Sequence, residues 1–427
     1  MIDVLVLGGG VAGLEAALGL SQQGFAVELL EASTRVGGSV TTETVDGFRC
    51  ELGAATLRAD GAILNERCDE FGIALRALGG GARRKGILTG AGLTYVGGPG
   101  DLMRSRLLSA RGKARALLEP LQGSSSNDDE SLEQFMVRRL GSQTGQLMAP
   151  LLARGVYAAP ASQLCVRTAF PRLYAMDQNK GLIRGMTSQT RAGIISLPGG
   201  LGALAQGYAH QLSDRIALET PAVSIERNAQ GWSVTSAQGR LTANDLVVAT
   251  PAPIAATLLA QAAPQLSQTL DAMQRSELTS VQLGFHGQQL PESFGFLVHP
   301  SAGGETLGCL FASQISSDAA PKGSSLVGCM VGVSSDPVAS ARATLEQALG
   351  WTAEPDMVLQ TDYPSGLPLY NAQHDRLRAQ VQDQLLALPG LQLAGNYLRG
   401  ISVESSLESG RLAAEVIMAK QTTRRVA

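Results

Sequence analysis

Three glycines near the amino terminus have the spacing of a turn that holds a phosphate. Gly8, Gly10 and Gly13 form a Gly-x-Gly-x-x-Gly run. In such a run the first glycine permits a tight turn, the second lets the backbone approach a pyrophosphate, and the third lets a helix pack against a strand. Val11 and Ala12 lie between them, where the N–H groups of a helix that starts here would face the phosphates. Because the run alone is a weak signal, the elements around it decide what it means.

The elements on both sides of the glycine run match a dinucleotide-binding unit. Residues 2–7 are rich in β-branched side chains and leucine, which predicts a strand, and residues 14–23 are rich in alanine and leucine, which predicts a helix. Residues 25–30 predict a second strand that leads into Glu31. A carboxylate at that place accepts hydrogen bonds from the hydroxyls of an adenosine ribose. We therefore predict a Rossmann-like domain that binds a dinucleotide.

Two further segments favour FAD over NAD. Arg35 and the Gly37-Gly38 turn follow Glu31, so they offer a second contact to the pyrophosphate and a path for the isoalloxazine ring. This Glu-x-x-x-Arg-x-Gly-Gly pattern resembles flavoproteins of the amine-oxidase superfamily. Residues 391–403 resemble the superfamily's segment that approaches the ribitol and then starts a helix, whose positive end faces the flavin pyrimidine.

The resemblance assigns residues from both ends of the chain to FAD, which is the predicted cofactor. A strand predicted over residues 219–225 contains Val223 and fits the segment that touches adenine. The implied fold class is α/β, with a Rossmann-like FAD domain, a mixed-sheet substrate domain and a helical insert. The residues assigned to FAD are Gly8, Gly10, Val11, Ala12, Gly13, Glu31, Ala32, Arg35, Gly37, Gly38, Ser39, Gly53, Ala54, Val223, Ala249, Tyr363, Gly395, Asn396, Ile401, Ser402 and Val403.

Several segments together resemble the protoporphyrinogen oxidase family, which includes coproporphyrinogen oxidases. Each segment is modest alone, but they occur in the family's order and spacing over nearly the whole chain. The segments are residues 105–113, 154–158, 169–171, 182–185, 197–201, 367–374 and 393–410.

The family resemblance implies a substrate pocket above the flavin. Phe294 and Leu297 would hold the macrocycle between them, Met330 would form the other wall, and Gly155 would leave room near the flavin. Lys85 stands where the family commonly has an arginine that pairs with a substrate propionate. A lysine keeps the charge but loses the bidentate fork of the guanidinium.

The chain also departs from the family pattern at several places. Tyr363 replaces a usual tryptophan near the flavin, and Ala159-Pro160 replaces a Gly-Asp-like turn. Ala54-Ala55 replaces a common Gly-Pro, and residues 314–321 lack the usual Phe-Pro. These departures bear on the choice of substrate more than on the fold or the cofactor.

The implied reaction is the six-electron oxidation of protoporphyrinogen IX to protoporphyrin IX in three rounds, with oxygen as acceptor and hydrogen peroxide released. We expect no catalytic side chain because the flavin carries the chemistry. We expect no metal site either, since the four histidines are scattered and the five cysteines form no CxxC pair. Coproporphyrinogen III oxidation, amine oxidation or carotenoid-type desaturation, and a non-catalytic FAD- or tetrapyrrole-binding role remain the alternatives.

Charge and hydropathy limit the partners. The chain has 34 Lys+Arg against 37 Asp+Glu, which excludes the global basic excess of a nucleic-acid coat. Residues 246–270 carry no charge, but their prolines argue against a membrane span. A basic helix predicted over residues 102–121 could lie on an anionic leaflet. The expected location is the cytoplasm, and peripheral contact with the inner face of the cell membrane is an open alternative. A homodimer is also compatible with the sequence.

The expected organisation has three parts. The remaining element predictions are a hairpin over 87–96, a helix over 131–140 capped by Ser131, strands over 216–250, a helix over 369–388 and a last helix over 407–420. The predicted parts are the FAD domain (1–80, 195–260 and 385–427), the substrate domain (81–100 and 261–384) and the helical insert (101–194).

Overall fold

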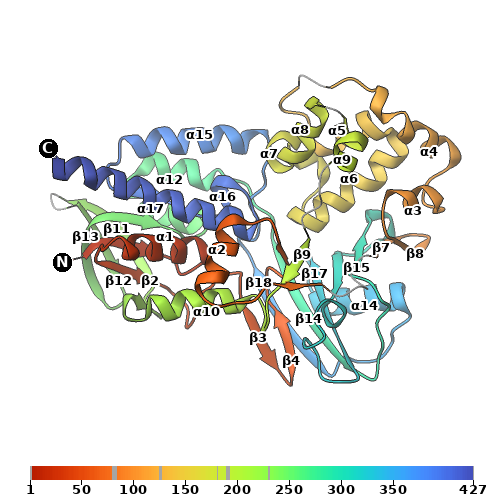
Figure 1. Cartoon of the computed structure of the whole chain (residues 1–427), viewed down its shortest axis with the longest axis horizontal. Coiled ribbons are helices and arrows are strands. Elements are labelled where there is room, and N and C mark those ends of the chain that lie inside the picture. Colours follow the sequence, from red (N-terminus) through yellow and green to blue (C-terminus); the bar gives the residue numbers. More distant parts are fainter. Residues whose placement is uncertain are drawn as a thin grey trace.

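The computed structural model describes residues 2–78, 84–124, 127–179, 181–188, 193–228 and 231–426. Two seven-stranded sheets lie at different ends of the molecule, and a group of helices lies beside the second sheet (Figure 1). This mixed architecture confirms the α/β fold class.

The first sheet is built from segments far apart in the chain. Its order is β10-β2-β1-β13-β12-β11, with β19 beside β13. The pairs of β1 with β2 and with β13 are parallel, as is the pair of β13 with β19, and they confirm the βαβ unit expected at the amino terminus. The bounds are β1 Ile2–Leu7, β2 Val27–Leu30, β10 Ile216–Ala217, β11 Ala222–Asn228, β12 Gly231–Ser236, β13 Gly239–Val248 and β19 Leu391–Leu393.

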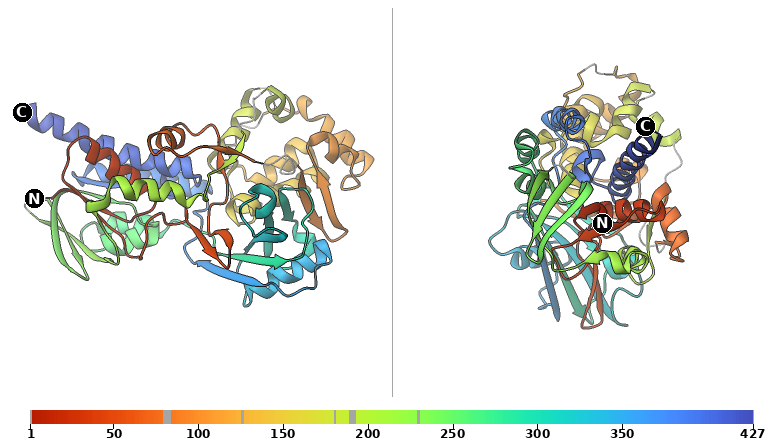
Figure 2. Two further views of the ribbon diagram at one scale, coloured as in Figure 1. Left: turned by 60° about the horizontal axis from the view of Figure 1, so that its bottom comes forward. Right: turned by 90° about the vertical axis from the view of Figure 1, so that its left-hand side faces the viewer.

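Helices cover both faces of this sheet, because its strands are apolar on both sides. On one face α1 (Val11–Gln22) and α17 (Val403–Val426) run side by side, next to α10 (Gly202–Gln211) and α2 (Ala62–Glu70) (Figure 2). The other face packs against α11 (Ala252–Leu259), α12 (Pro264–Asp271) and α15 (Ala372–Leu386).

The second sheet has the order β18-β14-β17-β16-β15-β7-β8. Helix α14 packs on one of its faces through Ala341 and Leu345. The hairpin expected over residues 87–96 is confirmed as β7 and β8. The bounds are β7 Lys85–Thr89, β8 Gly92–Val96, β14 Leu278–His286, β15 Gly295–Val298, β16 Thr306–Phe311, β17 Ser324–Val331, β18 Met357–Tyr363 and α14 Pro337–Leu349.

Short elements connect the sheets, and helices from the middle of the chain lie together beside β7 and β15 (Figure 1). The short strands are β3 Thr42–Val45, β4 Phe48–Glu51, β5 Leu57–Arg58, β6 Arg76–Ala77 and β9 Ile194–Ser196, and the short helices are α13 Ala312–Ile315 and α16 Asn396–Arg399. The middle helices are α3 Pro99–Arg104, α4 Ala110–Leu117, α5 Leu132–Leu140, α6 Ser142–Tyr157, α7 Val166–Ala169, α8 Pro171–Asn179 and α9 Leu182–Ser188.

Three element predictions are corrected. The helix expected over 102–121 is broken, because Ser105 is extended and Ser109 caps a new helix by accepting a hydrogen bond from Gly112 N–H. The strand expected from residue 219 starts at Ala222, since Glu219 has a left-handed φ of 52°. The last helix begins at Val403 rather than at residue 407.

Other predictions hold with small changes. The capping box at Ser131 is confirmed. Residues 246–270 form the end of β13 followed by α11 and α12, and no helix in the described ranges combines the length and apolar character needed to cross a membrane. The Gly79–Gly81 stretch and the middle of the turn at 228–231 lie outside the described residues. All five cysteines are buried free thiols.

Candidate FAD and substrate site

The turn between β1 and α1 is shaped for a close approach of backbone to a ligand. Gly8 has a φ of +104°, and a Cβ on Gly13 would lie 1.9 Å from the carbonyl oxygen of Gly8. A Cβ on Gly10 would meet no described atom within 4 Å, so the space in front of it is open. Helix α1 starts at Val11, and within the described chain no side chain caps it. Its free N–H groups therefore face a space that suits a pyrophosphate.

A second glycine turn lies on top of the first. Gly37 donates its N–H to the carbonyl oxygen of Gly9 at 2.7 Å, and a Cβ on Gly38 would come within 3.3 Å of the Gly10 Cα. Arg35 is held beside this turn by Thr41 Oγ1 and, at 3.8 Å, by Glu43. The pattern that suggested FAD thus brings its glycines together in space.

Glu31 stands at the carboxyl end of β2. Its Oε2 accepts a hydrogen bond from Gly9 N–H at 2.6 Å, and its Oε1 accepts from the backbone and hydroxyl of Ser33. Ala32 beside it is exposed. The carboxylate predicted to bind a ribose is therefore held against the glycine turn, next to the phosphate space.

The opposite side of the turn is formed by the end of β13. A Cβ on Gly8 would lie 2.9 Å from the carbonyl oxygen of Ala249. The hydroxyl of Thr250 is buried and has no hydrogen-bond partner among the described residues. An unpaired buried hydroxyl at a cofactor edge is accounted for if a ligand group completes it. These residues fit a bound dinucleotide.

Residues 39–54 lead from the cradle toward the second sheet. Ala54 N–H donates to the carbonyl oxygen of Ser39 at 3.0 Å, and a Cβ on Gly53 would lie 2.5 Å from the same oxygen. The carbonyl oxygen of Glu51 accepts a hydrogen bond from Gln282 Nε2 at 2.9 Å. This segment, which contains the predicted FAD residues Ser39, Gly53 and Ala54, therefore contacts the predicted substrate sheet directly.

The carboxyl-terminal segment returns to the amino-terminal cradle. Gly395 has a φ of +148°, and its N–H donates to Ser409 Oγ. A Cβ on Gly410 would lie 2.1 Å from the carbonyl oxygen of Ala12, so only glycine lets α17 lie this close to α1. Ser402 caps α17 by accepting from Ser405 N–H at 3.0 Å. Both chain ends thus meet at one place, as the resemblance implied.

The contacts of three residues near the predicted FAD segments were not predicted. Glu404 accepts hydrogen bonds from the first N–H groups of α2, at Ile63 and Leu64. Tyr370 donates its hydroxyl to the carbonyl oxygen of Asn396 at 2.7 Å, and His374 Nε2 bonds the carbonyl oxygen of Tyr397 at 2.9 Å. Both rings therefore hold α16, which carries the predicted ribitol contact. The only sequence signal was the spacing of Tyr370 and His374 within one family segment.

Two predicted FAD residues, Tyr363 and Val223, have fewer contacts with the glycine turns than the residues above. Tyr363 ends β18 and is half-buried; burial raises its pKa, while the nearby Arg35 acts to lower it. Val223 lies at the start of β11, the outer strand of the first sheet, and is 61% exposed. The chain just before it does reach the cradle, because Thr220 N–H donates to the carbonyl oxygen of Glu31. Ile401, just before α17, and Val403, its first residue, are half-buried.

The second sheet presents one half-exposed face. Strand register aligns Leu297 with Gly308 and Gly308 with Met330, and Leu310 with Gly328 in the next row. All five are half-buried, whereas the residues that alternate with them, such as Cys309 and Cys329, are buried toward α14. The result is a mostly apolar face with two glycines, where the side chains of Leu297 and Gln282 lie next to Gly308 and Gly328.

The predicted substrate residues lie along this face. Gly155 of α6 faces Leu297, and a Cβ on Gly155 would come within 2.7 Å of Leu297 Cδ2. Lys85 is exposed at the start of β7, and its Nζ lies 5.2 Å from the centre of the Phe294 ring. Arg83, its predicted neighbour, lies outside the described residues. The structure therefore brings Gly155, Leu297 and Met330 to one face of the sheet, and Phe294 lies next to Lys85 just before β15.

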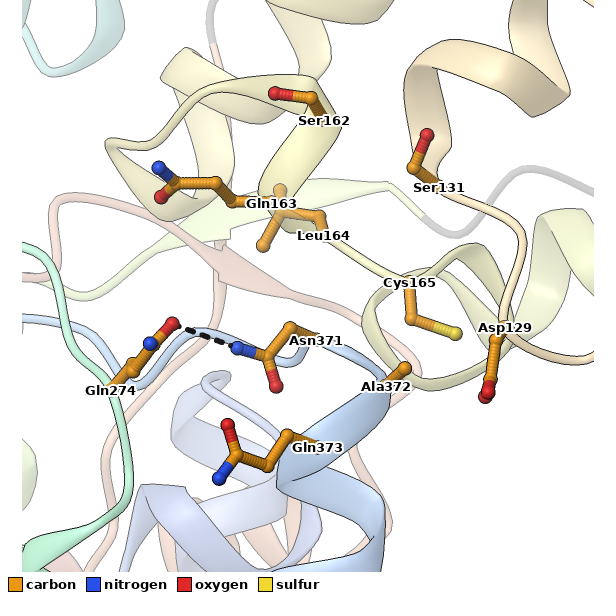
Figure 3. Close-up of a pocket in the computed structure, with 10 residues that line it drawn as sticks. All are labelled: Asp129, Ser131, Ser162, Gln163, Leu164, Cys165, Gln274, Asn371, Ala372 and Gln373. Atoms are coloured by element: carbon orange, nitrogen blue, oxygen red, sulfur yellow. Dashed lines mark hydrogen bonds between the residues drawn. The ribbon is translucent and has the colours of Figure 1, made fainter.

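A separate polar pocket of about 300 Å³ lies between the helical region and the start of α15 (Figure 3). The amide of Asn371 donates to Gln274 Oε1 across its floor at 2.9 Å. None of the predicted FAD or substrate residues lines it. Its lining residues are Asp129, Ser131, Ser162, Gln163, Leu164, Cys165, Gln274, Asn371, Ala372 and Gln373.

Known proteins share this sequence and fold. The chain is 25% identical to "Coproporphyrinogen III oxidase" of Bacillus subtilis (strain 168), covering 96% of each chain. It is 28% identical to "Protoporphyrinogen oxidase" of Homo sapiens, covering 97% of this chain and 98% of the human one.

Solved structures agree with these relatives. A protein from Exiguobacterium sp. 255-15 matches with a TM-score of 0.85 at 25% identity, covering 98% of this chain and 99% of the other. Putrescine oxidase matches with a TM-score of 0.75 at 18% identity, with coverage of 98% and 99%, and shows the fold alone. The family model described as "Flavin containing amine oxidoreductase" matches residues 11–418. The chain therefore belongs to the flavin-containing amine oxidoreductase family, and it is an oxidoreductase that uses FAD.

Proposed function

We propose that this protein oxidises a porphyrinogen to a porphyrin. The observation that carries the proposal is the half-exposed face of Leu297, Gly308, Leu310, Gly328 and Met330 beside the FAD cradle. A flat, largely apolar macrocycle needs a wide surface with few projecting side chains, and the two glycines add no side chain of their own to this face. The relatives named for porphyrinogen oxidation, at 25–28% identity over nearly the full chain, support the same substrate class.

The side chains would act by positioning rather than by proton transfer. FAD, when bound, accepts the hydride equivalent and passes its electrons to oxygen. The glycine cradle, Glu31 and the α1 amino terminus would hold the dinucleotide end. Leu297 and Met330 would fix the macrocycle's plane and exclude water, while Lys85 would pair with a propionate.

The proposed substrate is protoporphyrinogen IX, with protoporphyrin IX and hydrogen peroxide as products. Coproporphyrinogen III is the second candidate, because the two molecules differ by two vinyl groups against two propionates and pocket charge decides between them. Amine oxidation is less well supported. An aromatic cage would need Tyr370 beside the flavin, but this ring is 1% exposed and its hydroxyl is committed to Asn396.

Porphyrin fluorescence in air tests the proposal. The purified, FAD-loaded protein is supplied with each porphyrinogen in parallel, and peroxide is measured at the same time. We expect fluorescence well above autoxidation and about three peroxides per porphyrin, because each two-electron reoxidation yields one. A yellow, FAD-loaded protein that produces no porphyrin above autoxidation would overturn the proposal.

We also propose peripheral contact with an anionic membrane through the α3–α4 region. Leu117 and Leu121 are 63% and 77% exposed, and Arg104, Arg106 and Arg111 are exposed in the same stretch of the chain. Exposed leucines among arginines suit an anionic lipid surface. Of the other cations, Arg115 turns inward instead, donating to the carbonyl oxygens of Arg138 and Arg139.

Vesicle sedimentation tests this contact. Leu117→Ser combined with Leu121→Ser is expected to abolish binding to vesicles that contain anionic lipid. The control is Leu386→Ser, which removes a leucine that is 84% exposed at the end of α15. Equal binding of wild-type protein to neutral and anionic vesicles, or of both variants to anionic ones, would contradict the proposal.

A further inference from the structure

Arg154 is a half-buried cation without an acidic partner. It lies in the last turn of α6, where its Nη2 donates to the carbonyl oxygen of Thr306 at 3.1 Å. Its Nε is buried and finds no hydrogen-bond partner in the described part of the chain. No carboxylate among those residues lies within 4 Å of it. A partly buried guanidinium with unused donors is costly unless something completes its hydrogen bonds.

Arg154 lies on the side of α6 that packs against the half-exposed face. Leu147 and Leu151 of α6 pack with Ile87 and Leu297. Arg154 follows Leu151 by three residues, so it lies on the same side of the helix. Gly155, its neighbour, faces Leu297 directly.

Lys85 lies toward the other end of the same face. The register of β7 and β15 places Lys85 level with Gly295, whereas Thr306 precedes the pair of Gly308 with Leu297. At about 3.3 Å per residue the backbone of Lys85 and the Thr306 carbonyl oxygen that Arg154 contacts are separated by roughly 10–13 Å along the strand direction. One cation therefore lies near each end of the face.

We propose that Arg154 forms a second carboxylate-binding subsite, opposite Lys85, which selects porphyrinogens with propionates at both ends of the macrocycle. This inference rests on the proposed function. Protoporphyrinogen IX carries its two propionates on adjacent rings and vinyl groups on the other two. Coproporphyrinogen III carries propionates on all four rings, so it can present carboxylates at both ends of the face, whereas protoporphyrinogen IX presents both of its carboxylates on one side of the macrocycle. A guanidinium suits such a carboxylate because it offers two parallel N–H donors. The subsite therefore favours the tetracarboxylate coproporphyrinogen III, the second candidate named above, and it narrows the proposed substrate class in that direction.

The structural alternative is that Arg154 only holds the start of β16. Burial lowers the pKa of Arg154, and no nearby acid opposes this shift. A cation in the last turn of a helix is also stabilised by the helix dipole. A purely structural role would affect both porphyrinogens equally, so the comparison between them decides.

Equilibrium titration with the air-stable products tests the subsite. Wild type, Arg154→Gln and Arg154→Lys, all loaded with FAD, are titrated with coproporphyrin III and protoporphyrin IX, and KM is measured with both porphyrinogens. We expect Arg154→Gln to raise Kd for coproporphyrin III and KM for coproporphyrinogen III at least about tenfold. The corresponding values for protoporphyrin IX and protoporphyrinogen IX should rise less than about threefold. Arg154→Lys should lie between, since it keeps the charge but loses the fork.

Arg342→Gln is the matched control, because it removes a guanidinium that pairs with Glu354 on the surface of α14. If Arg154→Gln weakens the binding of both porphyrins equally, or of neither, the proposed subsite is overturned. If the wild-type protein oxidises neither porphyrinogen, the proposed function fails. The titration still reports on the subsite in that case: Arg154-dependent binding of coproporphyrin III supports it, and Arg154-independent binding overturns it.

Discussion

The side-chain amide of Gln282 donates a hydrogen bond to the backbone carbonyl oxygen of Glu51 at 2.9 Å. Gln282 belongs to β14 of the second sheet, and Glu51 ends β4 just before the predicted FAD residues Gly53 and Ala54. The donor is 5% exposed, so the bond is shielded from water. This contact fixes the half-exposed face relative to the FAD cradle.

Gln282→Leu should therefore destabilise the protein. The substitution leaves the Glu51 carbonyl oxygen without its partner, at a cost of about 1–3 kcal/mol in the free energy of unfolding. Denaturant unfolding followed by circular dichroism measures the loss. The control is Gln360→Leu on exposed β18, which should stay within about 0.5 kcal/mol of wild type. Equal effects of the two variants would show that the Glu51 contact contributes nothing.

Gly10→Ala separates cofactor binding from folding. The new methyl group meets no described atom within 4 Å, and a φ of −69° suits alanine. We expect the apo-protein to keep its Tm while FAD affinity falls about tenfold or more, because the methyl group occupies the pyrophosphate space. Isothermal titration calorimetry of the apo-protein with FAD measures the affinity, and thermal unfolding measures Tm.

Gly19→Ala is the control within the same helix. Its Cβ would meet Ala414 at an ordinary 3.7 Å. It should raise stability by about 0.5–1 kcal/mol and leave FAD affinity unchanged. Unchanged FAD affinity in Gly10→Ala would mean that the phosphates lie elsewhere.

The parts of this site that could be predicted are those built from short runs of the chain. Tight turns need glycine at fixed spacing, so the runs around Gly10 and Gly38 were readable from sequence and do lie together. The break in the helix predicted over residues 102–121 had a local signal too. Ser109 is a favourable cap, but the leucine and arginine pattern favoured one continuous helix.

The parts that could not be predicted are contacts across the fold. Glu404 caps α2 from more than 300 residues away, and no local pattern indicates which helix a carboxylate will reach. The half-burial of Arg154 likewise depends on how α6 meets β16. Such contacts follow from the tertiary packing of apolar faces, which fixes polar groups only after the elements have docked.

Gly155→Ala should narrow the substrate face. The added Cβ would lie 2.7 Å from Leu297 Cδ2, so the leucine must move. Because the leucine is half-exposed, it can shift into the space above the sheet. We expect a loss of about 1 kcal/mol in substrate binding, or roughly fivefold in KM, with little change in Tm. Steady-state kinetics with both porphyrinogens measure it.

Leu297→Ala in the Gly155→Ala background is the companion experiment. Removing the displaced side chain relieves the crowding, so KM should return toward the value of Leu297→Ala alone. Additive effects of the two substitutions would show that the two residues do not compete for the same space.

Glu15→Gln should loosen the FAD domain. Glu15 of α1 is 1% exposed and accepts hydrogen bonds from Arg67, Arg411 and Tyr208, which belong to α2, α17 and α10. Loss of the carboxylate charge leaves two guanidinium groups less well paired, and we expect a loss of about 2–4 kcal/mol in the free energy of unfolding.

Denaturant unfolding of apo-protein measures the Glu15→Gln effect. Glu354→Gln is the control, since it breaks an exposed ion pair with Arg342 and should cost less than about 1 kcal/mol. A loss no larger than that of the control would show that the four helices are held by apolar packing alone.

The stability of the protein should fall in mild acid because of His374. This ring is 1% exposed, its Nε2 bonds the carbonyl oxygen of Tyr397, and its Nδ1 is buried without a partner in the described chain. Burial lowers the pKa of His374 to about 4. In the unfolded chain a histidine titrates near pH 6.5, so between these values only the unfolded state binds the proton.

The stabilisation from neutral His374 is therefore complete above about pH 6.5 and is lost as the pH falls toward 4. A shift of this size corresponds to about 3 kcal/mol.

His374→Gln keeps a donor for the Tyr397 carbonyl oxygen but does not titrate. We expect the stability of wild type relative to His374→Gln to decline between pH 6.5 and 4, measured by denaturant unfolding at each pH. Since this ring holds α16 at the predicted ribitol contact, FAD should dissociate from wild type over the same range. If the difference in the free energy of unfolding between the two proteins stays constant with pH, protonation of His374 does not destabilise the fold.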